Sequence, residues 1–292
     1  MKLATYTEHG REKVGVVSED QMYICPISAY GLPYASMNEL IEKITDEELE
    51  QLKGEFIEEK ATALFAVKLE APIPVPKQDV ICLGENYASH AMEGAKFRNE
   101  SFDPEAHPSI YFSKRVNRAA ADGELIDGHF DLDVQADYES ELAVIIRRDA
   151  YKVRRERSRD YVFGYTVLND ISARVTQNKH RQWYRGKSFD GFTPMGPWIV
   201  TADEFAYPPV VQVQSRVNGE LRQDSSTRDM LYDIPYIIEE LSAGMTLKSG
   251  SIISTGTPSG VGLGFDPPKF LRPGDRVECT VTGIGTLTNI LK

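Results

Sequence analysis

The sequence has few cysteines and no excess of positive charge. Its three cysteines, Cys25, Cys82 and Cys279, lie far apart among apolar residues, without the CxxC or Cys/His spacing of a zinc site. We therefore expect buried, reduced thiols. The formal net charge of −11 provides no basic surface for a nucleic acid or for an anionic membrane.

Long apolar stretches are also missing. No segment approaches the roughly 18 apolar residues of a membrane span. Residues 1–15 lack the apolar core of about 7 to 15 residues that a signal peptide needs. We expect a cytoplasmic protein without a membrane partner. The 292 residues, 41% of them hydrophobic, are enough for one large domain or for a small domain attached to a larger one.

The first 70 residues have a pattern of their own. Short strand-like runs (KLATYT, KVGVVS, QMYICPI) precede a stretch with helical spacing of apolar residues, at Leu40, Ile41, Ile44, Leu49 and Leu52. The following APIPVPKQD, residues 71–79, has three prolines, which prevent helix and favour an extended connector. We predict a small N-terminal domain over residues 1–70 and a larger domain over 71–292.

The larger part is predicted to be rich in strands. Residues 138–147 and 161–169 are strand-like and apolar, and Asn218-Gly219 between alternating segments predicts a tight antiparallel hairpin. Asp233 can cap a helix that begins at Ile234. Because turn-separated strands outnumber strand-helix alternations, an α+β, β-rich fold is favoured over a doubly wound sheet.

Two glutamates in DYESELAVII indicate a metal site. Glu139 and Glu141 are two residues apart, so on a strand both carboxylates point to one face. This spacing also fits a solvent-facing strand edge. The LAVII that follows is apolar throughout, as in a strand buried on both faces, which places the carboxylates at the mouth of a core. A cation would relieve their repulsion, and oxygen ligands favour Mg²⁺ or Mn²⁺, with Ca²⁺ as an alternative.

A second acidic cluster lies just upstream, at Asp131, Asp133 and Asp137. It does not fit a calcium-binding EF-hand loop, because the position that requires glycine is Ala136 and the position of the bidentate glutamate is Leu142. We interpret these aspartates as charges on a loop.

A helix is predicted to begin at Asp170, directly after the strand over residues 161–169. In such a helix Arg174, Gln177 and Arg181 would share one face with Asp170. The pattern also fits an ordinary solvated face with an Asp-Arg pair.

Three further features suggest chemistry, each with a simpler alternative. His90 and Glu93 could form a general base with its orienting acceptor, or an ordinary surface pair. Lys187 could be a fixed buried charge or a snorkelling surface lysine. The glycine-rich STGTPSGVGLG, residues 254–264, could cradle an anion with its backbone N–H groups, although it matches no dinucleotide or Walker motif. Residues 89–107 are polar and are a candidate mobile lid.

Taken in order, six stretches resemble the fumarylacetoacetate hydrolase family, and in particular its acylpyruvate-hydrolysing and oxaloacetate-decarboxylating bacterial members. They are GENYASHAMEG, DYESELAVII, GYTVLNDISARVTQ, GKSFDGFTPMGP, VNGELRQ and STGTPSGVG. The resemblance implies a mixed β-sandwich roll behind a small N-terminal α/β domain, and a homodimer.

The resemblance also implies roles for individual residues. The metal ligands would be Glu139, Glu141 and Asp170. The catalytic residues would be His90, Glu93 and Lys187, and the substrate contacts would be Arg174, Gln177, Thr257 and, with a weaker match around it, Lys114. Residues 92–107 would form the family's lid.

The implied function is a divalent-metal-dependent hydrolase that cleaves a carbon-carbon bond in acylpyruvate-type 2-oxo acids. His90 would activate water, Lys187 would stabilise the oxyanion, and pyruvate would leave as an enolate held by the metal. The alternatives are an oxaloacetate decarboxylase, an isomerase or hydratase of hydroxymuconate-type dienoates, and a non-catalytic protein that binds oxo acids.

Overall fold

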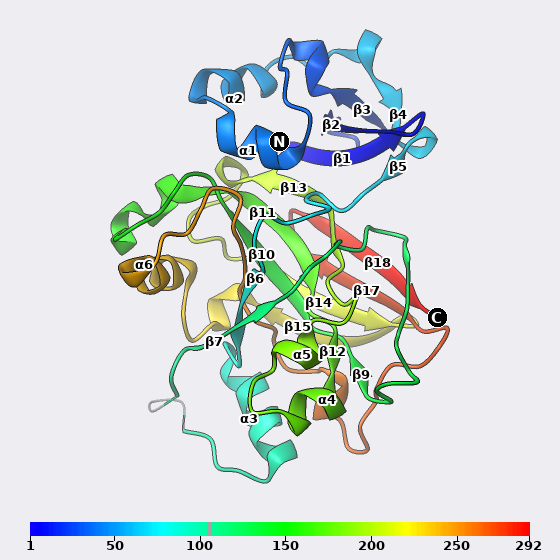
Figure 1. Ribbon diagram of the computed structural model, residues 1–292, viewed down its shortest axis with the longest axis vertical. Coiled ribbons are helices and arrows are strands. Elements are labelled where there is room, and N and C mark those ends of the chain that lie inside the picture. Colours follow the sequence, from blue (N-terminus) through cyan, green and yellow to red (C-terminus); the bar gives the residue numbers. More distant parts are fainter. Residues whose placement is uncertain (104–106) are drawn as a thin grey trace.

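The computed structural model describes residues 1–103 and 107–292 and consists of packed β-sheets with helices at their periphery (Figure 1). The strands are β1 (Lys2–Glu8), β2 (Arg11–Val17), β3 (Tyr23–Pro26), β4 (Thr62–Ala63), β5 (Lys68–Leu69), β6 (Val80–Gly84), β7 (Ile110–Lys114), β8 (Leu125–Ile126), β9 (Ala136–Asp137), β10 (Ser140–Ile146), β11 (Val162–Asn169), β12 (Ser172–Ala173), β13 (Met195–Thr201), β14 (Gln212–Val217), β15 (Glu220–Ser226), β16 (Ile252–Ser254), β17 (Arg276–Val281) and β18 (Gly285–Leu291).

The α-helices of the described residues are α1 (Met37–Lys43), α2 (Asp46–Leu52), α3 (Ala88–Arg98), α4 (Arg174–Lys179), α5 (Tyr184–Lys187) and α6 (Ile234–Gly244). Short 3-10 helices are η1 (Ile27–Tyr30), η2 (Glu58–Lys60), η3 (Leu64–Ala66), η4 (Arg155–Tyr161), η5 (Ala202–Glu204), η6 (Thr227–Asp229) and η7 (Gly262–Gly264). In Figure 1, α3, α4 and α5 gather at the end of the molecule opposite the N-terminal residues.

The largest sheet has eleven strands, in the order β4-β3-β2-β1-β13-β11-β10-β16-β6-β7, with β5 paired to β1. It is mixed, because β16 runs parallel to β6 whereas its other pairs are antiparallel. A second sheet has the order β15-β14-β17-β18-β8, and β9 pairs with β12.

The two larger sheets pack against each other through β10, β11 and β13 on one side and β14, β17 and β18 on the other. All residues of β10 and β11 are buried. A strand covered on both faces must be apolar almost throughout, which is the pattern that predicted these two strands. The predicted β-rich α+β class is confirmed.

The hairpin prediction is confirmed at the turn between β14 and β15. Asn218 and Gly219 have φ values of 52° and 84°, and Val217 pairs with Glu220 across the antiparallel strands. The predicted cap of α6 is also present, since the Asp233 side chain accepts the N–H of Tyr236 at 2.8 Å.

The amphipathic N-terminal stretch forms two helices, α1 and α2. The break lies at Thr45, whose side chain accepts the N–H of Glu48 while the Glu48 carboxylate accepts the N–H of Thr45, a capping box that starts α2. The apolar positions are buried as the spacing predicts, at Leu40, Ile41, Ile44, Leu49 and Leu52.

The N-terminal strands continue the large sheet, because Lys2 and Leu3 of β1 pair with Val200 and Ile199 of β13. The domain boundary near residue 71 stays a prediction. Of the remaining expectations, the three cysteines are free and buried. Among residues 1–103 and 107–292, no helix has the length and apolar character required to cross a membrane.

The contact between β1 and β13 generates a stability prediction. Leu3 is fully buried in one apolar cluster with Phe163 and Ile199. Leu3→Ala should lower the free energy of unfolding by about 2 to 5 kcal/mol. We expect urea denaturation to show one shifted transition. Met22→Ala, at an exposed residue, should change stability by no more than about 0.5 kcal/mol. Two transitions, of which only one shifts, would show that the N-terminal residues unfold independently.

Candidate metal centre and active site

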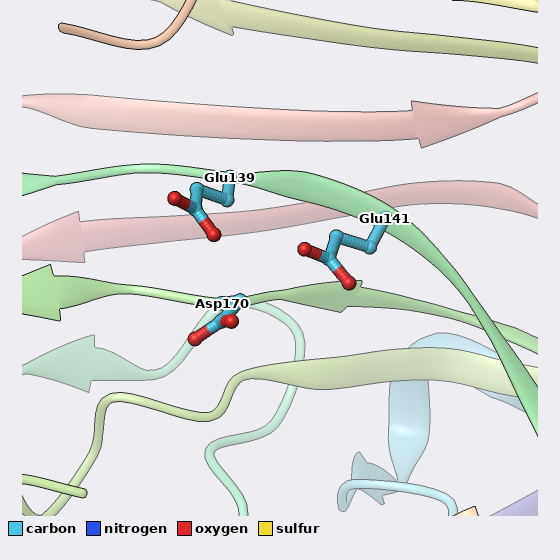
Figure 2. Close-up of side chains that lie close together, drawn as sticks. All are labelled: Glu139, Glu141 and Asp170. Atoms are coloured by element: carbon cyan, nitrogen blue, oxygen red, sulfur yellow. The ribbon is translucent and has the colours of Figure 1, made fainter. Parts of the chain in front are cut away.

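The three predicted metal ligands meet where β10 begins and β11 ends. Ser140 pairs with Asn169 across these antiparallel strands, so Glu139, just before β10, lies beside Asp170, just after β11. The Asp170 N–H donates to the Glu139 carbonyl at 2.9 Å. Glu141, two residues along from Glu139, points to the same side. Figure 2 shows both glutamate side chains directed toward Asp170.

The three carboxylates converge closely enough to share one cation. Oxygen atoms of Glu139, Glu141 and Asp170 all lie within 4.8 Å of one another, and all three residues are buried. Three buried like charges at this separation repel strongly. The cluster could therefore bind a divalent metal ion.

Buried cations neutralise two of the three carboxylates. The Lys187 ammonium donates to Glu139 at 2.7 Å and to Asp170 at 2.9 Å, and Lys114 donates to Asp170 at 2.5 Å. A guanidinium nitrogen of Arg174, Nη2, lies 2.7 Å from Glu139 Oε1. Each contacted carboxylate oxygen keeps a second lone pair for another ligand.

Within the described part of the chain, Glu141 has no cationic partner at hydrogen-bond distance. One of its oxygens accepts the Ser254 hydroxyl at 2.5 Å and the Gly256 N–H at 2.9 Å. Burial, together with the neighbouring charges of Asp170 and Glu139, raises the pKa of Glu141 well above its ordinary value. Burial also acts to raise the pKa of Glu139, but the charges of Lys187 and Arg174 outweigh it and hold that pKa well below its usual range.

The charge balance of the cluster fits a divalent cation. Four buried carboxylates, those of Asp137, Glu139, Glu141 and Asp170, face three buried cations, Lys114, Arg174 and Lys187. With Glu141 ionised, one negative charge remains. A divalent ion would reverse the sign of the net charge, which suits an anionic substrate. Three carboxylates without nitrogen or sulfur ligands form a donor set for a hard ion.

The predicted histidine and glutamate lie on α3. His90 Nδ1 is 3.5 Å from Glu93 Oε2, and the Glu93 carboxylate accepts the Gly260 N–H at 2.9 Å. Burial of His90 beside this anchored carboxylate excludes the ordinary surface pair.

One cavity brings most of these residues together. The cavity has a volume of about 40 Å³, which is enough for a few water molecules. Its walls are Leu83, Gly84, Glu85, His90, Gly94, Phe97, Arg98, Glu139, Glu141, Arg174, Gln177, Asn178, Trp183, Lys187, Thr257 and Leu263.

The predicted substrate contacts divide into two groups. Arg174, Gln177 and Thr257 line the cavity, and Arg174 Nη1 donates to Gln177 at 3.0 Å. Lys114 does not line it, because its ammonium is fully buried between Asp170 and the carbonyl of Ile171. Arg98 and Trp183 also line the cavity, and no motif in the sequence indicates them.

The helix predicted to start at Asp170 is wrong. Ser172 and Ala173 form β12, which pairs with β9, so α4 begins at Arg174 and excludes Asp170. Arg181 lies beyond α4 and is exposed. The expected Asp170-Arg174 pair is replaced by contacts of Arg174 with Asp137 and Glu139.

The interpretation of the upstream aspartates as loop charges is wrong for two of the three. Asp133 is 3% exposed and accepts the Thr176 N–H at 2.7 Å, near the start of α4. Asp137 is fully buried in β9 and contacts Arg174. Only Asp131 is exposed.

The glycine-rich segment 254–264 binds carboxylates of this chain. The N–H groups of Gly256, Gly260 and Gly262 donate to Glu141, Glu93 and Asp137, respectively. These N–H groups are therefore used to hold site residues and are not an open anion cradle. The candidate lid begins as α3, whose residues wall the cavity, whereas residues 104–106 of the lid lie outside the described part.

Comparisons with known proteins identify the family of the chain. Residues 79–292 match the family model described as the fumarylacetoacetate hydrolase C-terminal domain. Oxaloacetate tautomerase YisK of Bacillus subtilis is 48% identical over 227 residues, which cover 78% of this chain and 74% of that protein.

Two solved structures extend the similarity to the whole chain. A fumarylacetoacetate hydrolase from Exiguobacterium antarcticum is 38% identical, with a TM-score of 0.84, over 100% of this chain and 99% of its own. A maleylpyruvate hydrolase from Sphingobium sp. SYK-6, in complex with manganese(II) and pyruvate, is 30% identical, with a TM-score of 0.74, over 100% and 98%. The fold and the site define a class of small-molecule enzymes with a buried acidic cluster that could bind a divalent metal ion. The chain belongs to the fumarylacetoacetate hydrolase family, as the ordered motifs predicted.

Glu141, which forms hydrogen bonds but no ion pair among the described residues, generates a prediction about metal binding. In wild type, a divalent cation at one hundred times its Kd should stabilise the fold by about 2.7 kcal/mol. Because the pKa of Glu141 is raised, the cation must displace a proton, and its affinity should fall as the pH falls. Titration calorimetry in buffers of different ionisation enthalpy measures that proton release.

Glu141→Gln removes the negative charge but keeps the size of the side chain, and its amide oxygen can still accept hydrogen bonds from Ser254 and Gly256. At pH values above the usual pKa of a glutamate, the metal-free variant should be at least as stable as wild type, because it lacks the buried charge. Stabilisation by the cation should be lost. Thermal unfolding with and without Mn²⁺ measures both effects. Stabilisation by Mn²⁺ equal to that of wild type would exclude Glu141 as a ligand.

Proposed function

We propose that this protein is a divalent-metal-dependent enzyme that cleaves a carbon-carbon bond of acylpyruvate-type 2-oxo acids by hydrolysis, through an enolate of pyruvate. The supporting observation is that Glu139 and Glu141 of the acidic cluster line the same cavity as His90. A binding protein would need the cluster, but it would have no use for a buried histidine held by an anchored glutamate.

Glu139, Glu141 and Asp170 would hold the metal ion, with Mg²⁺ or Mn²⁺ as the cation and Ca²⁺ as an alternative. When bound, the ion supplies Lewis-acid polarisation of the keto and carboxylate oxygens of a 2-oxo acid. The manganese and pyruvate bound to the Sphingobium relative support this pairing.

His90 would act as the general base. Its Nδ1 faces Glu93, so an Nδ1–H can point at the carboxylate and Nε2 is left to accept a proton. In hydrolysis, His90 takes a proton from water as the water oxygen attacks the distal carbonyl. The bond between that carbonyl carbon and the pyruvate methylene then breaks, and the electron pair leaves as the enolate, which is protonated to give pyruvate.

Cations on the cavity wall would place the substrate. Lys187 uses two of its three N–H groups on Glu139 and Asp170, and it lies 5.0 Å from the Phe112 ring centroid, so it supplies a fixed positive charge for a developing oxyanion. Arg174, Gln177 and Thr257 would contact the substrate carboxylate and the acyl group. Lys114 would act indirectly, by holding Asp170.

Tautomerisation of oxaloacetate is the second candidate, favoured by the 48% identity to an oxaloacetate tautomerase. It requires a base that removes a proton from C3 of oxaloacetate, which gives the enolate of oxaloacetate itself, and it needs no attacking water. Decarboxylation of oxaloacetate and isomerisation or hydration of hydroxymuconate-type dienoates would use the same site. We further propose a homodimer whose partners are small molecules and do not include nucleic acid.

A substrate panel tests the proposal. We expect Mg²⁺- or Mn²⁺-dependent release of pyruvate from acetylpyruvate or fumarylpyruvate, measured with lactate dehydrogenase, and its loss in EDTA. Oxaloacetate tautomerisation and decarboxylation and hydroxymuconate isomerisation are followed in parallel by absorbance. Turnover of oxaloacetate alone would favour the second candidate. Oxalate binding without turnover of any substrate would indicate a non-catalytic protein.

His90→Gln tests the base. Hydrolysis should fall by about 10² to 10⁴, because the water loses its proton acceptor. Decarboxylation, which needs no attacking water, should fall less. His180→Gln changes an exposed histidine outside the cavity and is the control. Equal losses of the two reactions in His90→Gln would contradict a water-activating role.

A further inference from the structure

Asp137, two residues before Glu139, has a buried carboxylate whose two oxygens are both occupied. Oδ1 accepts the N–H of Tyr138 at 3.0 Å and that of Gly262 at 2.6 Å. Oδ2 accepts the N–H of Leu263 at 3.1 Å and the Nε–H of Arg174 at 3.0 Å. The side chain is fully buried, so no water competes for these donors. It therefore ties α4 to the glycine-rich turn that contains η7.

The first connection fixes Arg174. Asp137 Oδ2 lies 3.0 Å from Nε and 2.9 Å from Nη2 of the guanidinium, which holds one edge of its plane. Nη1 donates to Gln177. Nη2 lies 2.7 Å from Glu139, but the geometry of this ion pair is not that of a hydrogen bond. Arg174 and its partner Gln177 both lie in the cavity wall.

The second connection reaches the base through the backbone. Asp137 holds the N–H groups of Gly262 and Leu263, and the same turn donates the Gly260 N–H to Glu93. A Cβ added to Gly264 would lie 2.5 Å from the carboxyl carbon of Glu93, so this turn also packs directly on that side chain. Tyr138 adds a further tie, from its hydroxyl to the Gly260 carbonyl at 2.8 Å.

From these contacts we infer that Asp137 is a positioning residue for the proposed reaction. It orients Arg174 toward the substrate and, through the turn at Gly260–Gly264, it sets the position of Glu93 and therefore of His90. This inference rests on the proposed function for its kinetic consequences, whereas the two connections are properties of the chain alone.

Asp137→Asn is the informative change, because an amide has one acceptor oxygen where the carboxylate has two. An amide oxygen in the place of Oδ2 keeps the N–H groups of Arg174 and Leu263 but loses that of Gly262. An amide oxygen in the place of Oδ1 keeps Gly262 but loses both Arg174 and Leu263, so neither orientation preserves both connections in full. If Asp137 acts through Arg174, the KM for the 2-oxo acid should rise about tenfold, and if it acts through Glu93, kcat should fall about tenfold. We expect both changes, and we expect larger ones in Asp137→Ala.

Asp133→Asn is the matched control. Asp133 is also buried and belongs to the same acidic run, and it accepts the N–H of Thr176 in α4. Its hydrogen bonds go to backbone N–H groups of residues 135, 175 and 176, and not to the Arg174 side chain or to the turn. It should lower the stability of the fold while KM and kcat stay within about twofold of wild type. A general effect of losing a buried charge near α4 would appear equally in both variants.

Two further variants isolate the connections. In Arg174→Gln, adding Asp137→Asn should raise KM less than it does in wild type, since that connection is already lost. Gly264→Ala should displace the flexible end of Glu93 without unfolding the protein, and should lower kcat with little change in KM. The second variant keeps the inference testable if Asp137 variants fail to fold.

Hydrogen exchange provides a measurement that does not depend on activity. Asp137→Asn should accelerate amide exchange in both 171–179 and 258–266, and Asp133→Asn in the first segment alone. If wild type turns over no 2-oxo acid, the proposed function fails, and exchange alone then decides whether Asp137 makes the two connections. Acceleration of only one segment by Asp137→Asn, additive KM effects in the double variant, or kinetics equal to wild type would overturn the inference.

Discussion

The arrangement of the site depends on buried charge at the junction of β10 and β11. Four carboxylates and three cations lie almost without water beside the centre of the large sheet. Such groups are tolerated only when each one has partners, since an unpaired buried charge costs several kcal/mol. The partners come from β7, β9, α4 and α5, and these elements must be placed with the accuracy of a hydrogen bond. Among the described residues, Glu141 is the carboxylate of this cluster that has no cationic partner, so its charge is not neutralised by the chain itself.

The same constraint explains the glycine-rich turn. Its N–H groups are divided among Glu141 of β10, Asp137 of β9 and Glu93 of α3. Glycines allow the backbone to approach these side chains closely, and a Cβ at Gly262 or Gly264 would collide with Asp137 or Glu93. The turn thus connects the acidic cluster to helix α3, and it makes the positions of Glu93 and His90 dependent on the interior of the sheet.

Much of this could be predicted from local patterns. The apolar runs of β10 and β11, the hairpin at Asn218-Gly219 and the spacing of Glu139 and Glu141 depend on neighbours in sequence, and the structure has them where they were expected. The helix expected from Asp170 failed because residues 172–173 pair with residues 136–137, more than thirty positions away. The function of Asp137 could not be predicted for the same reason, because its partners are far from it in sequence.

By itself, then, the sequence determined the strands, the shared face of two glutamates and the membership of the fumarylacetoacetate hydrolase family. Whether those glutamates would lie on a wet edge or in a charged interior was decided by tertiary structure. The register of β10 on β11 brought Asp170 beside Glu139, and the packing of α4 and α5 brought Arg174 and Lys187. The reason is physical: spacing along a strand sets the direction of a side chain, whereas its pKa and its partners depend on what the rest of the chain places in front of it.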